Sequence, residues 1–518
     1  MNDRTVLAFD CGTQSLRAII FSAQGRVKAV AKVEYEHPYF SRGPGLAEQD
    51  PELYWNSLGV ACRQLKRSDP AAFRTIAGIG VTAQRASMVN LDADGNVLRP
   101  AILWLDQRKS EPFPVWNRFV ELFLKIAGIR KKIDAIQSRA QCIWIMQNQP
   151  EIWEKTHKYL QVSGFLNYRL TGIFADSTAS QIGYMPFDYK KQEWAGPAHM
   201  ASRLFPVEGE KLAQLVQPGQ VLGKITAKAA EFCGLEKNLP VIACGSDKGC
   251  ETLGAGVINE KMASLSFGTT ATVQTMCRKY IEPVRHFPSY PAPVQGYYNP
   301  EIEIFRGFWM ITWFKKQFAH KEVQKAAELG IPAEELLNKC LERTEPGAMG
   351  LVVQPYWSPG LDHPEGKGAM IGFADVHTRD HMYRAVIEGL GFAMFEGLGK
   401  IERKTGKKIQ AASVSGGASQ SDAICRIMAS IFNIPMYRGT THETSALGAA
   451  ILTAVGLGWY DGTCEAVENM ARVKTVFRPD PDDVQIYRQL YSRVYARLYR
   501  ALSPLYSQIQ TITGYPRP

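Results

Sequence analysis

The chain is predicted to fold as an α/β protein whose two halves share one design and face each other across a cleft. Two observations lead to this prediction. Strand and helix patterns alternate through residues 1–256, as in domains built on mixed or parallel sheets. In addition, a strand–turn–strand pattern at residues 7–17 is echoed at residues 263–272. A repeat at the scale of a domain favours two related halves over one irregular fold.

The first strand–turn–strand pattern is a predicted β-hairpin with polar groups at its tip. Apolar strands over 6–9 and 16–21 flank Asp10 and the turn Gly12-Thr13-Gln14-Ser15. Gly12 lets a ligand approach the backbone, and successive N–H groups at such a tip can form an anion-binding nest. Thr13 and Ser15 add hydroxyls, and Asp10 can hold a hydrated Mg²⁺. The tip predicts a phosphate site, and an ordinary polar turn is the alternative.

Two later segments offer similar groups. The second hairpin carries Gly268-Thr269-Thr270 at its turn. Further on, a strand over 413–415 leads to Gly416-Gly417-Ala418, and Ser421 precedes a helical pattern. A strand, a glycine turn and a helix N-terminus together form a backbone platform for a nucleotide. Residues 443–458 predict a small-residue helix, and we expect it to pack closely under this platform.

A chain of 518 residues is too long for one core. We expect a first domain over 1–256, a second over 257–460 and a helical extension over 461–518. The extension shows an aromatic stripe at helical spacing. This stripe predicts a long C-terminal helix that packs on the body or contributes to a homodimer contact. Its members are Tyr487, Leu490, Tyr491, Val494, Tyr495, Leu498 and Leu502.

The composition and charge of the chain bear on its localisation and on its possible partners. The content of 45% hydrophobic and 21% charged residues is that of an ordinary globular protein. No apolar segment follows the N-terminal Met-Asn-Asp-Arg, and ten cysteines occur without a Cys-x-x-Cys. The uncharged stretch 445–460 is too short to span a bilayer. These features predict a cytoplasmic protein with no membrane partner. The net charge of +10 is dispersed, so we expect no nucleic-acid partner either.

Taken together, these motifs resemble those of the FGGY family of carbohydrate kinases, within the actin-like ATPase superfamily. The resemblance runs along most of the chain. Its N-terminal signature is poorer, because Gln141 stands where many members have a lysine shortly before a tryptophan. Its C-terminal signature, over 368–388, deviates at Phe373. The other matching segments are Asp10–Arg17, Glu48–Pro51 with Trp55, Trp104–Arg108, Gly245–Asp247, Phe267–Thr270, Gly416–Ala418 and Ala446–Ala450.

The resemblance implies a fold and an activity. The fold is α/β, with two actin-like (ribonuclease H-like) ATPase domains flanking a central nucleotide and sugar cleft. The activity is ATP-dependent phosphorylation of a terminal hydroxyl of a small sugar or polyol. The sequence has no Gly-x4-Gly-Lys-Ser/Thr, so the phosphates are not held in a Walker-type loop. ATP is expected between the Gly12-Thr13 and Gly268-Thr269 turns and on the Gly416–Ala418 platform.

Asp247 is the expected general base, as the resemblance implies. It follows the apolar run 241–246, which places it at the carboxyl end of a strand, where ligands collect in open α/β sheets. Mg²⁺ is expected at Asp10 and Asp247. The alternative role for Asp247 is a helix N-cap. The neighbouring Lys248 is expected either to hold Asp247 ionised, to touch the substrate or to face solvent.

The sugar pocket is expected around Gln84, Arg85, Trp104 and Asp106, with Trp104 as a flat wall and Asp106 as a bidentate hydroxyl acceptor. Glycerol kinases carry a carboxylate directly after the Gln-Arg pair, whereas this chain has Ala86. The Met-His-Gly-Gln type of segment of xylulokinases is absent as well. We therefore expect an acceptor larger than glycerol, such as the five-carbon ketose xylulose or a pentitol.

Three other functions are compatible with parts of this pattern. An actin- or chaperone-like ATPase would use the same nucleotide clamp without needing the Gln84-Arg85, Trp104 and Asp247 positions together. A degenerate kinase retained as a regulator would have lost phosphate or base positions, all of which are occupied here. Within the family, a glycerol kinase is the third alternative.

Overall fold

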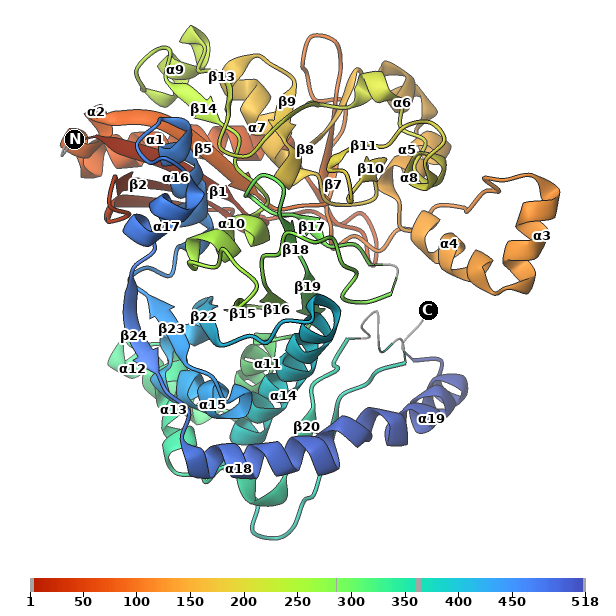
Figure 1. The fold of residues 1–518 in the computed structure, drawn as a ribbon, viewed down its shortest axis with the longest axis vertical. Coiled ribbons are helices and arrows are strands. Elements are labelled where there is room, and N and C mark those ends of the chain that lie inside the picture. The colour runs from red at the N-terminus through yellow and green to blue at the C-terminus, as the bar shows by residue number, and fades with distance from the viewer. Residues whose placement is uncertain (1–3, 286, 359–362, 364, 516–518) are drawn as a thin grey trace. The chain divides into compact units, whose positions relative to one another are not determined.

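The structure is a computed structural model that describes residues 4–285, 287–358, 363 and 365–515 (Figure 1). The chain divides into two compact units. Unit 1 comprises Met1–Gly254, Tyr290–Tyr298 and Glu443–Ala471. Unit 2 comprises Ala255–Ser289, Asn299–His442 and Arg472–Pro518. The first division falls near the expected boundary at 256–257, but two later segments of the chain return to unit 1, so the units are not contiguous in sequence.

Unit 1 is built on a six-stranded mixed sheet with the order β13-β14-β5-β1-β2-β3. Strands β1, β2 and β3 form an antiparallel meander, β5 and β14 follow in parallel with β1, and β13 closes the edge antiparallel. The β1–β2 hairpin pairs Asp10 with Arg17 and Cys11 with Leu16, which confirms the predicted first hairpin. The strands are β1 Thr5–Cys11, β2 Ser15–Ser22, β3 Val27–Glu34, β5 Ile76–Ala83, β13 Val221–Lys224 and β14 Pro240–Ile242.

Unit 2 repeats the same order of pairings. Its sheet runs β19-β16-β15-β22-β23-β24, and the successive pairs are antiparallel, antiparallel, parallel, parallel and antiparallel, which is the pattern of the unit 1 sheet read from β3 to β13. The β15–β16 hairpin therefore corresponds to β1–β2, which confirms the predicted two halves of one design. The strands are β15 Met262–Phe267, β16 Ala271–Gln274, β19 Glu301–Ile304, β22 Ala411–Ser415, β23 Met436–Gly439 and β24 Val473–Phe477.

Helices cover each sheet and bury its apolar side chains. In unit 1, α1 begins where Asp50 accepts from the Glu52 amide and Pro51 takes the first helical position, and it packs on β2 and β3. Helix α1 spans Pro51–Ser68, and 3-10 turns cover Thr178–Ser180 and Gly209–Lys211. The other helices of unit 1 are α2 Pro70–Arg74, α3 Arg118–Ile126, α4 Ile129–Gln137, α5 Gln141–Asn148, α6 Pro150–Lys155, α7 Val162–Thr171, α8 Met200–Leu204, α9 Ala227–Cys233, α10 Asp247–Gly254, α16 Thr444–Gly456 and α17 Thr463–Met470.

Smaller sheets complete unit 1. A four-stranded sheet, β4-β7-β6-β8, carries the segments that follow β5 in the chain. A short ribbon from residues 290–298 also belongs to this unit, although it lies in sequence between strands of unit 2. The strands are β4 Glu48–Gln49, β6 Met88–Leu91, β7 Ala101–Ile102, β8 Lys158–Gln161, β9 Ala175–Ser177, β10 Phe187–Asp188, β11 Glu193–Trp194, β12 Gln214–Val216, β17 Tyr290–Pro291 and β18 Tyr298–Asn299.

The helix α16 corrects one expectation. It is the predicted small-residue helix, but it belongs to unit 1 and packs on α10, β1 and β5 rather than under the Gly416–Ala418 platform. The two helices approach so closely that a Cβ on Gly448 would lie 2.0 Å from the carbonyl oxygen of Cys250, and one on Gly254 would lie 2.0 Å from that of Thr444. Close packing through small residues was predicted correctly, but with the wrong partner.

Unit 2 is centred on the long helix α14, which packs against β16, β19 and β20. Trp309 and Trp313 of α11 lie partly buried against the core. The further elements are α11 Trp309–Phe318, α12 His320–Leu329, α13 Ala333–Glu342, β20 Val352–Gln354, β21 Ala369–Ile371, α14 Arg379–Thr405 and α15 Asp422–Phe432, with 3-10 turns Ala348–Gly350 and Gly417–Gln420.

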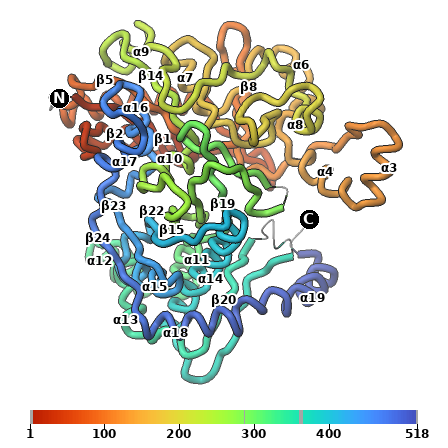
Figure 2. The backbone as a smooth tube through the Cα atoms, viewed as in Figure 1, coloured from red at the N-terminus to blue at the C-terminus, as the bar shows by residue number. Residues whose placement is uncertain are grey.

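The C-terminal stripe forms a nearly continuous helix on unit 2, as predicted. α18 (Pro481–Leu490) passes through one π-helical stretch (Tyr491–Tyr495) into α19 (Ala496–Thr513), and the backbone tube runs through all three (Figure 2). Its tyrosines meet Phe392 of α14. The Tyr487 hydroxyl donates to Glu388 over 2.9 Å and accepts from Arg384 over 3.0 Å within a buried ion pair. Among the described residues, no helix is long and apolar enough to cross a membrane.

Candidate functional site

The tip of the β1–β2 hairpin holds the partly buried Asp10 among other charged groups. The Gly12 amide donates to the Ser15 carbonyl over 3.0 Å and closes the turn. Because Asp10 and Arg17 are opposite each other in the hairpin, the Arg17 guanidinium lies 3.6 Å from the Asp10 carboxylate. The same guanidinium lies 3.5 Å from Glu443 at the start of α16. This arginine therefore ties the hairpin to a segment more than 400 residues away in the chain.

The pKa of Asp10 is raised to about 7, chiefly because burial penalises the charged carboxylate. Arg17 opposes this shift, whereas the carboxylates of Asp247, Glu443 and Glu251 add to it. Asp10 and Asp247, which the sequence placed at two separate strand ends, are thus close enough to influence each other. A concentration of negative charge of this kind is stabilised by a cation.

Asp247 stands at the first position of α10, just beyond the strand end where Ser246 pairs with Ala83 of β5. The helix is capped by Ser246, whose hydroxyl accepts from the Gly249 amide over 3.2 Å and whose carbonyl accepts from Cys250. The Asp247 carboxylate accepts a hydrogen bond from the adjacent Lys248 amide over 2.8 Å. The N-cap role weighed for Asp247 is therefore taken by its neighbour.

The pKa of Asp247 is shifted from that of an ordinary exposed carboxylate. Burial raises its pKa, while the charges of Arg85 and Lys248 pull that pKa back down. The Lys248 ammonium itself lies 2.6 Å from Glu251, one turn along the same helix. Of the roles considered for Lys248, holding Asp247 ionised fits this arrangement, since its charge contributes to the Asp247 pKa while its head group is paired.

A hydrogen-bonded chain joins the hairpin tip to two of the predicted sugar-pocket residues. The Thr13 hydroxyl donates to the Gln84 side chain over 2.7 Å and accepts from the Trp104 indole over 3.0 Å. Trp104 is 50% exposed, as a stacking wall requires. Gln84, in contrast, is 4% exposed and also donates to Gln49 and Tyr54. Direct contact between the Gln84 side chain and a sugar was expected, and the structure instead gives Gln84 the role of holding Thr13.

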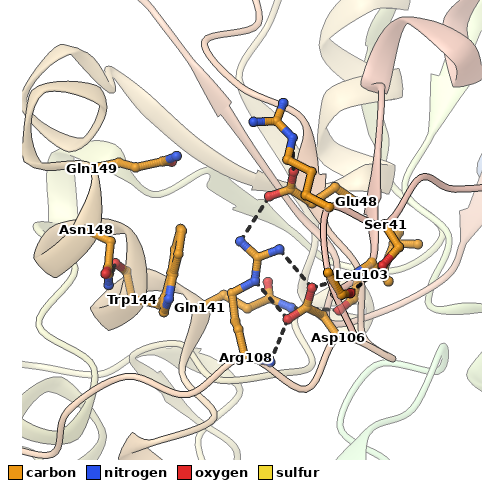
Figure 3. Close-up of polar contacts among 12 residues, drawn as sticks. Ser41, Glu48, Leu103, Asp106, Arg108, Gln141, Trp144, Asn148 and Gln149 are labelled. Atoms are coloured by element: carbon orange, nitrogen blue, oxygen red, sulfur yellow. Dashed lines mark hydrogen bonds and ion pairs between the residues drawn. The ribbon is translucent and has the colours of Figure 1, made fainter. Parts of the chain in front are cut away.

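Asp106 also differs from expectation, because its carboxylate is saturated (Figure 3). One oxygen accepts from the amide and Nε of Arg108, both over 2.8 Å, and the other accepts from Arg108 Nη2 and from the Ala47 amide. The side chain is 1% exposed. Arg108 continues to Glu48 over 2.9 Å and lies over the Trp144 ring. Asp106 thus orders the loop that carries Trp104 and has no oxygen left for a bidentate grip on a sugar.

The departure noted at Gln141 contributes to the same loop. Its side chain donates to the carbonyls of Ala86 over 3.0 Å and Leu103 over 3.3 Å. Ala86 has a φ of 54°, in the left-handed region that alanine rarely adopts. A glutamine at this position therefore holds the backbone after Arg85 in a strained turn, and such strain commonly marks functional loops.

Arg85 lies half-buried beside that turn and takes part in the Asp247 environment. Its guanidinium sits 5.0 Å from the centre of the Tyr290 ring, in the ribbon that returns to unit 1 from the second half of the sequence. Tyr290 in turn meets Tyr189 edge-on at 5.8 Å. Asp247, Arg85 and Tyr290 therefore come from three distant segments. Sequence reasoning missed Tyr290, and no motif pointed to it.

Unit 2 brings its two predicted phosphate segments together. Gly268, Thr269 and Thr270 form the β15–β16 turn, and the Gly268 carbonyl accepts from the Phe308 amide over 3.0 Å. Gly416 has a φ of 81°, and a Cβ there would lie 3.0 Å from the Gly268 amide nitrogen. The glycine pair therefore packs directly against the hairpin turn. A Cβ on Gly417 would meet no atom within 4 Å, so this position faces open space.

The predicted platform has the expected local structure. β22 ends at Ser415, a 3-10 turn covers Gly417–Gln420 and includes Ala418, and α15 begins at Asp422. The Ser421 hydroxyl accepts from the Ile424 amide over 3.3 Å, so it caps α15. In the repeated topology this turn follows the strand equivalent to β5, whose own end leads to Gln84-Arg85. The Gln84-Arg85 loop of unit 1 and the Gly416–Ala418 turn of unit 2 thus follow corresponding strands.

Two further residues of the charged site had no assigned role in the sequence. Arg17 and Glu443 lie within segments that the sequence analysis singled out, but no role was predicted for either side chain. The signal for Arg17 was its position opposite Asp10 in an antiparallel hairpin, which a register argument could have found. Glu443 had no comparable signal, because its proximity to Arg17 depends on the return of residues 443–471 to unit 1.

Comparison with known proteins agrees with this arrangement. Residues 5–254 match the model of the FGGY family of carbohydrate kinases, N-terminal domain, and residues 263–457 match that of the C-terminal domain. The chain is 29% identical over 489 residues to the uncharacterized sugar kinase YgcE of Escherichia coli (strain K12), covering 94% of this chain and 92% of that protein.

Two xylulose kinases are also similar. The enzyme of Staphylococcus epidermidis is 28% identical over 499 residues, which covers 94% of this chain and 95% of that protein. The crystal structure of xylulose kinase from Rhodospirillum rubrum superposes with a TM-score of 0.82 at 25% identity, covering 97% of this chain and all of that one. The fold is therefore the two-domain, actin-like architecture of these kinases. This chain belongs to the FGGY family of carbohydrate kinases and is a sugar phosphotransferase.

Proposed function

We propose that the protein transfers the γ-phosphoryl group of ATP to a terminal hydroxyl of a five-carbon ketose such as xylulose, or of a pentitol, with Asp247 as general base. The observation that carries this proposal is the setting of Asp247. It is a partly buried carboxylate just beyond a strand end, its pKa is raised, and Ser246 caps the helix in its place. A base that accepts a hydroxyl proton is the one group such a transfer needs besides phosphate and metal binding.

ATP would be held by the two glycine turns. The backbone of Thr13, Gln14 and Ser15 in unit 1 and of Gly268, Thr269 and Thr270 in unit 2 would face the phosphates, and Gly416, Gly417, Ala418 and Ser421 would form the nucleotide platform. The open space at Gly417 supports this part of the proposal.

Mg²⁺ fits the residues around Asp10. The described residues include no group of three or more His, Cys, Asp or Glu side chains arranged to hold a metal by themselves. Mg²⁺ usually keeps several waters and takes only one or two carboxylates together with phosphate oxygens. Asp10 and Asp247, whose mutual repulsion contributes to the raised pKa of Asp10, are the carboxylates that would hold it. The bound cation would neutralise charge on the phosphates.

The choice of a five-carbon acceptor is supported by the residues of unit 1 that are expected to surround the sugar. Trp104 presents an exposed ring, Arg85 lies over the Tyr290 ring and lowers the pKa of Asp247, and Ala86 leaves no carboxylate after the Gln-Arg pair. Glycerol would lack an acceptor for one of its hydroxyls here, so a longer polyhydroxyl chain suits the site better. The names of the xylulose kinase relatives support a pentulose, at 28% and 25% identity.

The test is ADP release in a coupled assay with a panel of pentuloses, hexuloses, pentitols and glycerol. We expect pentuloses or pentitols to stimulate release most. Efficient turnover of glycerol with all five-carbon compounds inert would refute the proposed acceptor, and ATP hydrolysis unaffected by any sugar would favour the actin- or chaperone-like alternative.

The role of Asp247 has its own test. Asp247→Asn should bind ATP normally in calorimetry but lose about 10²–10⁴-fold in kcat. Asp375→Asn, an exposed aspartate outside the site, is the matched control and should behave like the wild type. An Asp247→Asn enzyme with near-normal kcat would remove Asp247 as the base.

A further inference from the structure

The helical hairpin formed by α3 and α4 exposes an unusual amount of apolar surface. Phe119, Leu122, Phe123 and Ile126 recur at i, i+3, i+4 and i+7, so they form one stripe on α3. Their exposed fractions are 87%, 57%, 66% and 79%. None of the residues of α3 is buried. Within unit 1, α3 and α4 lie side by side and stand apart from the neighbouring elements in Figures 1 and 2.

The opposite face of α3 packs on the protein, so the apolar stripe is not the face that anchors the hairpin to unit 1. Leu124 packs against the cluster that includes Ile133. Arg130 then ties the hairpin together, since it contacts Glu121 over 2.8 Å, Asp134 over 2.7 Å and the Phe113 carbonyl over 2.9 Å. These contacts fix which face of α3 points outward.

The same contacts leave the hairpin strongly cationic. Glu121 and Asp134 are the only acidic residues between 118 and 137, and both pair with Arg130. Five basic and two acidic residues give this segment a net charge of +3. No hydrogen bond or ion pair involves the exposed basic side chains of Arg118, Lys125, Lys131 and Lys132 in the part of the chain that the structure describes. By helical spacing, Arg118 and Lys125 flank the apolar stripe on one side. The outward surface thus combines two phenylalanines and two aliphatic residues with unpaired positive charge.

A second copy of the chain is a poor occupant for this surface. Symmetric pairing of the stripes would place the unpaired cations of both copies near one another with no acidic residue available to them. The stripe is also small, because a stable protein interface buries about 800 Å² on each partner, whereas here four apolar side chains carry the contact. A partner with a negatively charged surface over an apolar interior would match both the basic side chains and the apolar stripe.

We propose that the α3–α4 hairpin docks the protein on anionic phospholipid membranes. Phe119, Leu122, Phe123 and Ile126 enter the boundary between headgroups and acyl chains, and Arg118, Lys125, Lys131 and Lys132 contact the anionic headgroups. An amphipathic helix with aromatic and aliphatic residues on one face and basic residues beside them binds membranes in this manner. The docking is peripheral. The sequence-based expectation of no membrane partner considered only segments able to span a bilayer.

The test is co-sedimentation of the full-length protein with vesicles. Vesicles of phosphatidylcholine containing about 30% phosphatidylglycerol are compared with pure phosphatidylcholine vesicles. Two variants separate the contributions: Phe119→Ser with Phe123→Ser removes apolar contact, and Arg118→Glu with Lys125→Glu reverses charge. Ile512→Ser, which removes an 82% exposed side chain on α19, is the matched control.

We expect the wild type and the Ile512→Ser control to sediment with the anionic vesicles and not with neutral ones. Each double variant should bind at least about tenfold more weakly, with unchanged circular dichroism and kinase activity in solution. Added salt should weaken binding of the wild type. Equal binding by the Phe119→Ser/Phe123→Ser variant, or no sedimentation of the wild type, would overturn the proposal. It would also be overturned if light scattering shows a dimer that this variant dissociates, because the stripe would then be a contact between copies.

Discussion

The contact between α10 and α16 allows a sharp test of how the helix packing positions Asp247. A Cβ on Gly448 would lie 2.0 Å from the carbonyl oxygen of Cys250, and real Cβ atoms essentially never approach another atom closer than 3.0 Å. Gly448→Ala must therefore push the helices apart by at least 1.0 Å, the difference between these two distances. The obstacle is backbone, so no side chain can rotate away to relieve it.

The consequence follows from the position of Asp247 at the start of α10. Overpacking of this kind costs about 1–3 kcal/mol of folding free energy. A displacement of about 1 Å in a catalytic group lowers turnover by roughly 10²-fold. We expect Gly448→Ala to lower the urea midpoint of unfolding and to reduce kcat in the coupled assay by about that factor.

The matched control is Gly399→Ala, two turns before the end of α14, where the new Cβ would meet only the end of the Arg403 side chain at 3.3 Å. Alanine is the better helix former by about 1 kcal/mol, so this variant should be as stable as the wild type or more so, with normal kcat. A Gly448→Ala protein with wild-type stability and turnover would refute the claim that the helix contact fixes the carboxylate.

Three further results are expected. Gly417→Val should raise the KM for ATP, because its side chain would enter space that holds no protein atom, and an unchanged KM would place the nucleotide elsewhere. Arg85→Met should move the acid limb of the kcat/KM profile to higher pH. The reason is that the Arg85 charge lowers the pKa of Asp247, which must be ionised to act as base; an unmoved limb would contradict this coupling. Tyr487→Phe should lose about 1–3 kcal/mol of stability in urea unfolding, since it removes the donor to the buried Glu388 carboxylate, and a loss below a few tenths would show that the network is dispensable.

Much of the fold followed from local pattern. The two hairpins, the strand end before Asp247, the glycine platform and the C-terminal helix were all predicted at the residues where the structure has them. Each depends on neighbours in sequence: alternation of apolar residues specifies a strand, and glycine with hydroxyl residues specifies a turn. The repeated order of strands also agrees with the similarity of residues 7–17 and 263–272.

The predictions that differ from the structure concern side chains whose hydrogen-bond partners are distant in the sequence. The sequence showed that Asp106 and Gln84 are polar and follow strands, but not that Arg108 and Ala47 saturate the first or that Gln49 and Tyr54 enclose the second. Whether a polar group faces a ligand or a protein donor depends on which group reaches it in the folded chain.

The sequence by itself determined the α/β class, the family and the residues that carry charge and hydroxyl groups at strand ends. Only the tertiary structure decided which of these groups remain available. Residues 443–471 illustrate the difference, because their composition predicts a closely packed helix whichever unit it joins. Its packing on α10, with Glu443 beside Arg17, depends on the chain returning to unit 1. Local sequence sets the shape of an element, whereas the free energy of burying its surface against a distant segment sets its partner.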